Sequence, residues 1–362
     1  MKSDRRKLLV SVTAVAAALG GAALWRVMRR ERAVESELPL QAPTIAKTVG
    51  SMPYRRFGKT GLLVSEIGFG GWPIGGQSYG AVEHAESLRA LARAEELGCN
   101  IVDTAMVYGD SEQVLGEFLK GRRDKWIVAT KFSGQPEGMR ATLERQLRRL
   151  GTEAVDFYQI HWAPERGGEG LYEELYELKQ AGKARFVGVS VNSPGNIDYV
   201  IDHTHIDGVQ LAFSLLDPVP FLPRMRRLHE SGLAVIARSS LREGFLTGKY
   251  RRDVTFKDTN DQRSKWSQAQ IAAVVDQVEQ FRFLEAEAGS LLAAAVRYPL
   301  SYPEVSTVLL GTKSVAYANS NFGRLPGGRL SRASLERIAR LQLDIGLWSP
   351  RERLVRSWRQ LI

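Results

Sequence analysis

The predicted fold depends on one stretch of the sequence, Asp103–Glu112, which reads DTAMVYGDSE. It follows a short apolar run and precedes an amphipathic segment, so we expect it to contain a strand end, a tight loop and the start of a helix. Within it, Ser111 is expected to cap that helix, and Glu112 to complement the positive helix end. The carboxylate of Asp103 and the phenol of Tyr108 suggest acid–base chemistry, provided that other segments bring partners to the same place.

Short apolar segments alternate with helical patterns on both sides of this stretch. Strands are expected at residues 67–70, 100–104, 126–131, 155–161, 186–191, 208–213, 233–237 and 305–310. Helices are expected at about 82–97, 111–120, 138–150, 170–181, 195–203 and 220–231, from about 314, and at 331–345. Because eight strands alternate with helices over roughly 300 residues, the pattern favours a (β/α)8 TIM barrel. A short N-terminal β-hairpin is expected at 54–57 and 62–64.

The positive charge of the chain lies at its two ends. The formal net charge is +10, of which residues 1–32 supply +6 and residues 351–362 supply +3. The body between them carries only +1, so the basic composition is poor evidence for nucleic-acid binding, and no nucleic-acid partner is expected.

The first 32 residues are typical of a targeting segment. The pair Arg5-Arg6 precedes an uncharged run from Leu8 to Trp25, an order that describes an export signal and resembles the bacterial twin-arginine signal. We therefore expect export to a periplasmic or other extracytoplasmic compartment. The uncharged run is also about as long as a short membrane-spanning helix, so an uncleaved anchor or a cytoplasmic protein are the alternatives.

The chain is expected to divide into a signal or anchor at 1–32, a linker at 33–50, a barrel at 51–350 and a basic tail at 351–362. The linker is inferred because residues 33–50 lack clear periodicity. Cys99 is the only cysteine, which excludes an internal disulfide, and it is expected to be a small buried filler. No metal site is expected, because the histidines lack ligand spacing.

Four polar residues end successive predicted strands. Asp103, Lys131, His161 and Ser190 are 28, 30 and 29 residues apart, which is the length of one βα unit. Because the strands of such a barrel are parallel, these side chains should meet at the mouth where the strands end. Tyr108, on the loop after the second strand, can reach the same space. A cluster of Asp, Tyr, Lys and His drawn from separate segments indicates a catalytic site.

The motifs around these residues resemble those of the aldo/keto reductase superfamily over residues 52 to 345. They are Tyr54–Gly61, Asp103-Thr104-Ala105 with Tyr108-Gly109, Ala129-Thr130-Lys131, Gly188-Val189-Ser190 and Leu246–Tyr250. The resemblance implies an NADP(H)-dependent carbonyl reductase on a (β/α)8 barrel, with Asp103, Tyr108, Lys131 and His161 in the four catalytic positions. Tyr108 would protonate the carbonyl oxygen, with support from Lys131 and Asp103, and His161 would orient the carbonyl.

The same resemblance implies the cofactor contacts. The positions are Gly71, Trp72, Ser190, Gln210, Arg238, Ser239, Leu241, Gly244, Gly311, Lys313, Tyr317 and Asn321. Ser190 and Gln210 correspond to the positions that hold the nicotinamide carboxamide. Lys313, in a segment that opens a helix ending at Asn321, favours NADP over NAD because a lysine at a helix N-terminus suits an anion.

Several positions depart from the family pattern. Val191 follows Ser190 where relatives commonly have Asn or Arg, and Tyr317 and Ser320 replace two usual adenine contacts. Many relatives have an aromatic residue where this chain has Arg238 and a proline where it has Ser240. The guanidinium of Arg238 is expected either to stack on the nicotinamide ring or to form an ion pair.

Two tryptophans, Trp72 and Trp162, are expected to contact the substrate, a small and partly apolar carbonyl compound. The long segment 242–267 is also expected to contribute to the mouth. A second reading is a redox-sensing or regulatory subunit that binds NADP(H) with little turnover, because relatives of this fold attach to ion channels. A third is an exported binding protein without activity. Membrane association through residues 8–25 remains an alternative to a soluble form.

Overall fold

The computed structural model describes residues 28, 30–76, 79–164, 166–191, 193–219, 221–325 and 327–348 of the chain. The export signal predicted from Arg5 to Trp25 and the basic tail at 351–362 lie outside these residues. Within the described part, no helix has the length and apolar character needed to cross a membrane.

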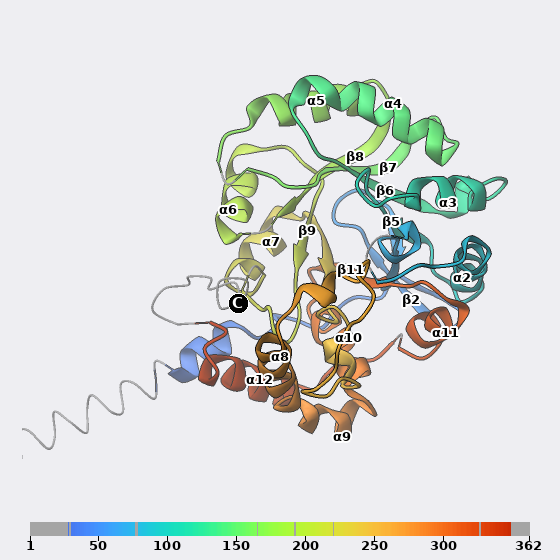
Figure 1. The fold of residues 1–362 in the computed structure, drawn as a ribbon. Helices are drawn as coiled ribbons and strands as arrows, with labels where there is room; N and C mark the ends of the chain where they lie inside the picture. Colours follow the sequence, from blue (N-terminus) through green and yellow to red (C-terminus); the bar gives the residue numbers. More distant parts are fainter. Residues whose placement is uncertain are drawn as a thin grey trace, which may run out of the picture.

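Eight parallel strands close into a barrel, which confirms the predicted (β/α)8 fold (Figure 1). Around the barrel they follow the order β10, β11, β4, β5, β6, β7, β8, β9. Their bounds are β4 Ile67–Gly70, β5 Ile101–Asp103, β6 Ile127–Phe132, β7 Val155–Ile160, β8 Ala184–Val191, β9 Gly208–Ala212, β10 Ala234–Arg238 and β11 Val305–Gly311. Each coincides with a predicted strand to within about two residues, because buried parallel strands read as short, nearly continuous apolar runs.

Helices surround the strands (Figure 1). They are α2 His84–Glu96, α3 Ser111–Phe118, α4 Met139–Leu150, α5 Glu169–Gln180, α6 Pro194–His203, α7 Met225–Ser231, α8 Gln268–Glu279, α9 Glu285–Ala288, α10 Leu291–Leu300, α11 Val315–Gly323 and α12 Arg332–Asp344. The sequence pattern of α4 shows why such helices form. Leu143, Leu147 and Leu150 recur at helical spacing and are buried, and the helix ends at Gly151 in the left-handed conformation.

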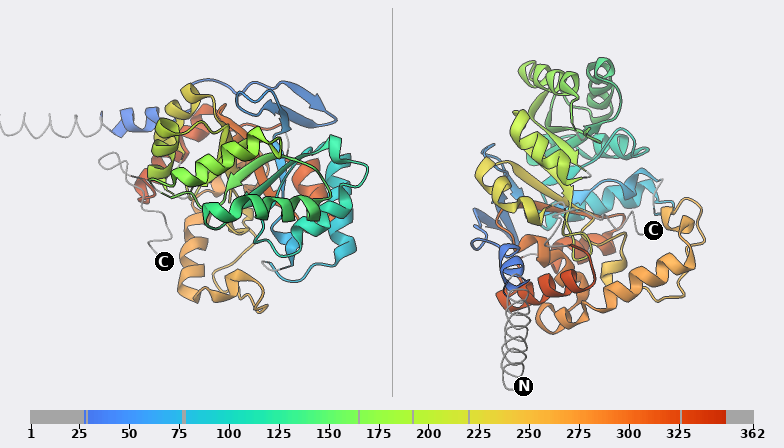
Figure 2. Two further views of the ribbon diagram at one scale, coloured as in Figure 1. Left: turned by 90° about the horizontal axis from the view of Figure 1, so that it is seen from above. Right: turned by 90° about the vertical axis from the view of Figure 1, so that its left-hand side faces the viewer.

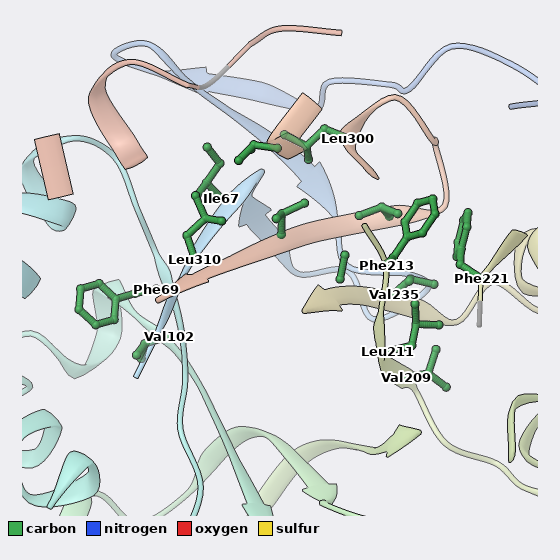
Figure 3. Packing of buried hydrophobic residues seen from close by; sticks show 14 of the residues in the cluster. Ile67, Phe69, Val102, Val209, Leu211, Phe213, Phe221, Val235, Leu300 and Leu310 are labelled. Atoms are coloured by element: carbon green, nitrogen blue, oxygen red, sulfur yellow. The ribbon is translucent and has the colours of Figure 1, made fainter. Parts of the chain in front are cut away.

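The main hydrophobic core lies where the strands meet the helices. Part of it appears in Figure 3, where Phe213 and Phe221 lie beside Val235 of β10. The rings of these two phenylalanines are 4.4 Å apart between centroids. Cys99 is buried in the same core, as expected of a small filler. The interlocked apolar side chains fix the strands and therefore fix the polar residues at the strand ends.

A second, smaller core closes one end of the barrel. Strand β2 (Met52–Arg56) and strand β3 (Leu63–Ser65) form the predicted hairpin, which brings Phe57 against Phe157 of β7 with centroids 5.1 Å apart. Gly58 lets the hairpin approach, since a Cβ there would lie 2.4 Å from the backbone nitrogen of Ala234. Phe157 lies near the start of β7, so the hairpin covers the end of the barrel where the strands begin. The polar residues lie at the other end, where the strands finish. The two views in Figure 2 show the hairpin and the α8 segment on opposite sides of the barrel.

Residues 33–50 are more ordered than the predicted linker. Strand β1 (Lys47–Val49) pairs with β2 and makes the hairpin a three-stranded sheet. Residues 30–36 are helical, Val34 and Leu38 are buried, and Tyr302 donates a hydrogen bond to the carbonyl of Glu37. Figure 1 shows this helix beside α12. The stretch lacks clear periodicity because only two of its side chains enter the core and its strand pairs through backbone groups.

Candidate active site

A cavity of about 730 Å³ opens where the barrel strands end. Its walls include residues at or just after the ends of seven of the eight strands, together with the loop after β10 and the first turns of α11. Every predicted catalytic, cofactor and substrate residue lines this cavity except Lys131, which is fully buried directly beneath it. The mouth of the barrel is therefore the candidate site.

Three of the four predicted catalytic residues meet at the floor of the cavity. The ammonium of Lys131 donates to the carboxylate of Asp103 and, at 2.8 Å, to the carbonyl of Thr104. Its third partner is the phenol oxygen of Tyr108, 3.4 Å away. Burial opposes the charge on Lys131, but the charges and hydrogen bonds of Asp103 and Tyr108 outweigh it and raise the pKa of the ammonium. A permanent positive charge therefore lies next to the Tyr108 hydroxyl.

Asp103 is held by two amides as well as by the lysine. Gln159 of β7 and Gln210 of β9 donate to its second carboxylate oxygen at 3.0 and 2.9 Å. These bonds fix the carboxylate across the floor and satisfy a charge that is 3% exposed. Gln210 was expected to hold the nicotinamide; it lines the cavity, and its amide nitrogen is already committed to Asp103. Gln159 was not expected in the site at all.

His161 completes the cluster from the end of β7. Its ring lies edge-on to Tyr108, with centroids 5.6 Å apart, and its Nδ1 is 3.3 Å from the hydroxyl of Ser133. Burial lowers the pKa of His161 to about 3, and the charges of Lys131 and Arg238 act in the same direction. The imidazole is therefore neutral near pH 7 and can donate one N–H toward the cavity.

The loop that carries Tyr108 is held tightly against its neighbour. A Cβ at Gly75 would lie 1.8 Å from the carbonyl oxygen of Tyr108, so only glycine allows this approach. Trp72 stacks near the Tyr108 ring, with centroids 6.0 Å apart. Trp162 stacks on His161 at 4.1 Å and is 56% exposed at the mouth. The rings of Tyr108 and His161 therefore each pack against a tryptophan.

The predicted role of Ser111 is wrong. The first residue of α3 is Ser111 itself, the preceding Asp110 takes the cap position, and neither makes a side-chain capping bond. The buried Ser111 hydroxyl donates to the carbonyl of Gly71 and accepts from Thr104, both at 2.8 Å. It is therefore a tie between the ends of β4 and β5. Glu112 lies in the first turn of α3 as predicted, and it also accepts hydrogen bonds from Thr130 and Gln146.

These observations can be compared with known proteins. The sequence profile described as the aldo/keto reductase family matches residues 66–342. The chain belongs to the aldo/keto reductase family. It is therefore an oxidoreductase that uses a nicotinamide cofactor.

This chain has relatives whose names state different cofactors. It is 28% identical to aldo-keto reductase yakc [NADP(+)] of Schizosaccharomyces pombe, over 80% of this chain and 91% of the relative. It is 25% identical to NADH-specific methylglyoxal reductase of Escherichia coli, over 74% and 92%. The solved holo form of aldo-keto reductase AKR11C1 from Bacillus halodurans superposes with a TM-score of 0.68 at 25% identity, covering 80% of this chain and 96% of that one.

The loop after β10 lines the far side of the reductase cavity in a strained conformation. Ser239, Arg242 and Glu243 have φ angles of 58°, 50° and 48°, which non-glycine residues seldom adopt, and Gly244 follows at 88°. Such strain concentrates at ligand-binding loops, where the surrounding structure maintains it. Ser239, Leu241 and Gly244 were expected cofactor contacts, and all three line the cavity.

The start of α11 and the residues before it form another wall of the cavity. Lys313 reaches back to the carbonyl of Tyr79 at 2.6 Å, and Asn321 donates to Thr312 at 3.0 Å. The helix continues to Gly323, two residues beyond the predicted end. The amide of Val315 donates to Glu86 at 2.8 Å, so one backbone group expected to attract a phosphate already has a carboxylate partner.

Several residues of the segment 242–267 line the cavity. Arg263 holds the segment together. Its guanidinium donates hydrogen bonds to the carboxylate of Asp261, to the carbonyl of Glu243 at 2.9 Å and to the hydroxyl of Tyr250 at 2.7 Å. Its charge also lies 4.9 Å from the centre of the Tyr79 ring. This segment was expected to form part of the mouth, whereas Tyr79 and Arg263 were not expected in the site. Their pairing links loops far apart in the sequence, so no local pattern indicates it.

The cavity fits a nicotinamide dinucleotide. Its lining runs from Asp103, Tyr108 and His161 to the residues of α11, and it includes the cations Arg242, Lys249 and Lys313, which suit a diphosphate. Lys249 lies over the ring of Tyr317, 5.9 Å from its centre, beside the exposed face where an adenine could stack. Among the described residues, no cluster of three His, Cys, Asp or Glu could hold a metal ion.

Proposed function

We propose that this aldo/keto reductase converts an aldehyde or ketone to an alcohol with NADPH, and that Tyr108 is the general acid. The observation that supports this role most directly is the phenol oxygen of Tyr108, which lies 3.4 Å from the buried Lys131 ammonium in a residue that lines the cavity. Lys131 is in turn paired with Asp103. A structural ion pair alone would not require a tyrosine hydroxyl beside the ammonium at the wall of a cavity.

The residues at the floor account for the proton that the product needs. When bound, the cofactor supplies a hydride to the carbonyl carbon, and the oxygen then takes up a proton. Tyr108 would donate this proton, because the ammonium of Lys131 stabilises the negative charge left on the phenol oxygen. Asp103 keeps that ammonium charged and directed toward Tyr108. The neutral imidazole of His161 would donate a hydrogen bond to the carbonyl oxygen and hold it beside the phenol.

NADP is proposed over NAD because of Lys313. Its ammonium is at the start of α11 on the cavity wall, where it could pair with the 2′-phosphate. The carboxylate of Glu86 at the same helix start acts against an added anion. Direct measurement of dissociation constants for NADPH and NADH decides between them, and an NADPH value at least about tenfold lower supports the proposal.

A steady-state assay tests the reaction itself. The purified protein is given NADPH and, in turn, an aromatic aldehyde, an aliphatic aldehyde and a ketone, and NADPH oxidation is followed. We expect many turnovers with at least one carbonyl compound. Tight retention of the cofactor without turnover across the panel would contradict the enzyme and favour a redox-sensing subunit. The aromatic lining from Trp72 and Trp162 supports a partly apolar substrate.

We also propose that the chain is exported. The support is the order of Arg5-Arg6 and the uncharged run to Trp25. Residues 30–38 pack against the barrel, so a cut before residue 30 would leave the folded body complete. Fractionation of a tagged protein, with its mature N-terminus sequenced, tests this. Recovery of the full-length chain from the soluble cytoplasm would contradict export.

A further inference from the structure

Arg238 places a cation on the floor of the cavity, among the strand ends that receive the reacting part of the cofactor. It is the last residue of β10, and its guanidinium donates to the carbonyl of Val191 at 3.3 Å. Val191 ends β8, and β9 lies between β8 and β10. The guanidinium therefore crosses the end of β9, beside Ser190 and Gln210, and all three side chains line the cavity.

The proposed reaction fixes where the nicotinamide ring must lie. A carbonyl oxygen held by Tyr108 and His161 puts its carbon within about 3–3.5 Å of the hydride donor. The donor ring is therefore close to the floor that Arg238 crosses. The field of Arg238 reaches this region, because it contributes to the low pKa of His161.

We propose that Arg238 makes this site bind the reduced cofactor more tightly than the oxidised cofactor. The nicotinamide ring is neutral when reduced and positively charged when oxidised. A guanidinium beside it repels only the oxidised form, and because Arg238 is partly buried, water screens this repulsion less than at an exposed site. The proposal rests on the proposed function only for the position of the ring. It makes a prediction about binding that can be measured without a substrate.

Equilibrium titrations of NADPH and NADP+ into the purified protein test this inference. The measured quantity is the ratio of the two dissociation constants, NADP+ over NADPH. In Arg238→Gln, which removes the charge and keeps a polar side chain, we expect this ratio to fall about tenfold. In Arg238→Lys, which keeps the charge and loses the planar group, the ratio should stay within about twofold of the wild-type ratio.

A matched control removes a cation from the other end of the cavity. Lys249 lies over the ring of Tyr317, a residue of α11 and not of the strand ends that Arg238 crosses, so Lys249→Gln should weaken both cofactor forms by the same factor and leave the ratio unchanged. An unchanged ratio in Arg238→Gln, or a ratio that falls equally in Arg238→Lys, would overturn the proposal and leave Arg238 as a packing residue. Wild-type protein that binds both forms without turning over carbonyls would contradict the proposed function alone. Failure to bind either form would overturn both.

Discussion

The two sides of the cavity use lysine in opposite ways. On the catalytic side, Lys131 is fully buried and bonded to Asp103, to a carbonyl and to Tyr108. On the cofactor side, Lys313 is partly exposed and its ammonium bonds a loop carbonyl. Strands from the rigid barrel hold the first lysine, whereas a loop and the start of a helix hold the second.

This difference explains where the chain keeps the family pattern and where it departs. Asp103, Tyr108, Lys131 and His161 depend on one another through charges and hydrogen bonds, so changing one leaves a buried group without its partner. Tyr317 and Ser320 belong to α11 on the cavity wall, where under the proposed function each would meet the cofactor separately and a substitution would adjust affinity. Under the proposed function, the side that holds Lys131 would determine the kind of reaction and the side that holds Lys313 would determine the preferred cofactor.

Removal of the buried lysine should have the largest effect. Lys131→Met should lower kcat about 10³-fold, because the phenol loses the charge that supports proton transfer. It should also destabilise the fold by about 3–5 kcal/mol, since Asp103 is left as an unpaired buried carboxylate. Steady-state kinetics and urea unfolding measure the two effects.

The double variant Lys131→Met/Asp103→Asn separates these effects. With both charges gone, most of the lost stability should return while activity stays low. If activity returned together with stability, Lys131 would be a structural residue and the contrast between the two sides would be lost.

Loss of the cofactor-side lysine should act on one ligand only. Lys313→Met should raise the dissociation constant for NADPH about tenfold and leave that for NADH unchanged, because only NADPH carries the extra phosphate. Added salt should reduce the difference, since the side chain is partly exposed. Equal weakening of both cofactors, measured by titration, would show that Lys313 acts through the fold.

Because the imidazole of His161 is buried, we expect the free energy of unfolding to fall at acid pH. The pKa of His161 is about 3 in the folded protein, against an ordinary value of 6.5. Between these values the unfolded chain binds a proton that the folded chain does not, so stability falls as the pH falls below about 6.5. Between about pH 7 and 4.5, the free energy of unfolding of His161→Gln should therefore fall by roughly 2 kcal/mol less than that of the wild type. If urea unfolding showed the same loss of unfolding free energy in both proteins, His161 would have an ordinary pKa in the folded protein.

An ion pair outside the cavity provides the control for these substitutions. Arg332 of α12 pairs with Glu35 of the N-terminal helix, and both side chains are largely exposed. Arg332→Ala should leave kcat, both cofactor affinities and the unfolding midpoint unchanged, because exposed pairs contribute little. A large loss of stability would show that residues 30–38 depend on this pair and not on the buried Val34 and Leu38.

The sequence predicted the barrel well because buried parallel strands have a local signature. It did not predict α8, α9 or α10. In α10, eight of ten residues are buried and Pro299 lies inside the helix, so neither an amphipathic period nor a clear boundary is visible. Strand β1 was missed because exposed Lys47, Thr48 and Val49 pair through their backbone.

Part of the site could also be predicted, for the same physical reason. Residues at strand ends recur at the length of a βα unit, which brought Asp103, Lys131 and His161 together. The bonds of Gln159 and Ser111 could not be predicted, because a buried amide or hydroxyl chooses its partner in three dimensions. The assigned roles of the catalytic and cofactor residues remain predictions until they are measured.

The most direct measurement is a single-turnover reaction of Tyr108→Phe with bound NADPH and an aldehyde that wild type reduces. The substitution removes one hydroxyl and keeps the ring that packs beside Trp72 and His161. We predict that the rate of NADPH oxidation falls by about 10³-fold while the NADPH dissociation constant changes less than about twofold. A variant that oxidises NADPH at the wild-type rate would contradict the role of Tyr108 as the acid and, with it, the account of the catalytic side.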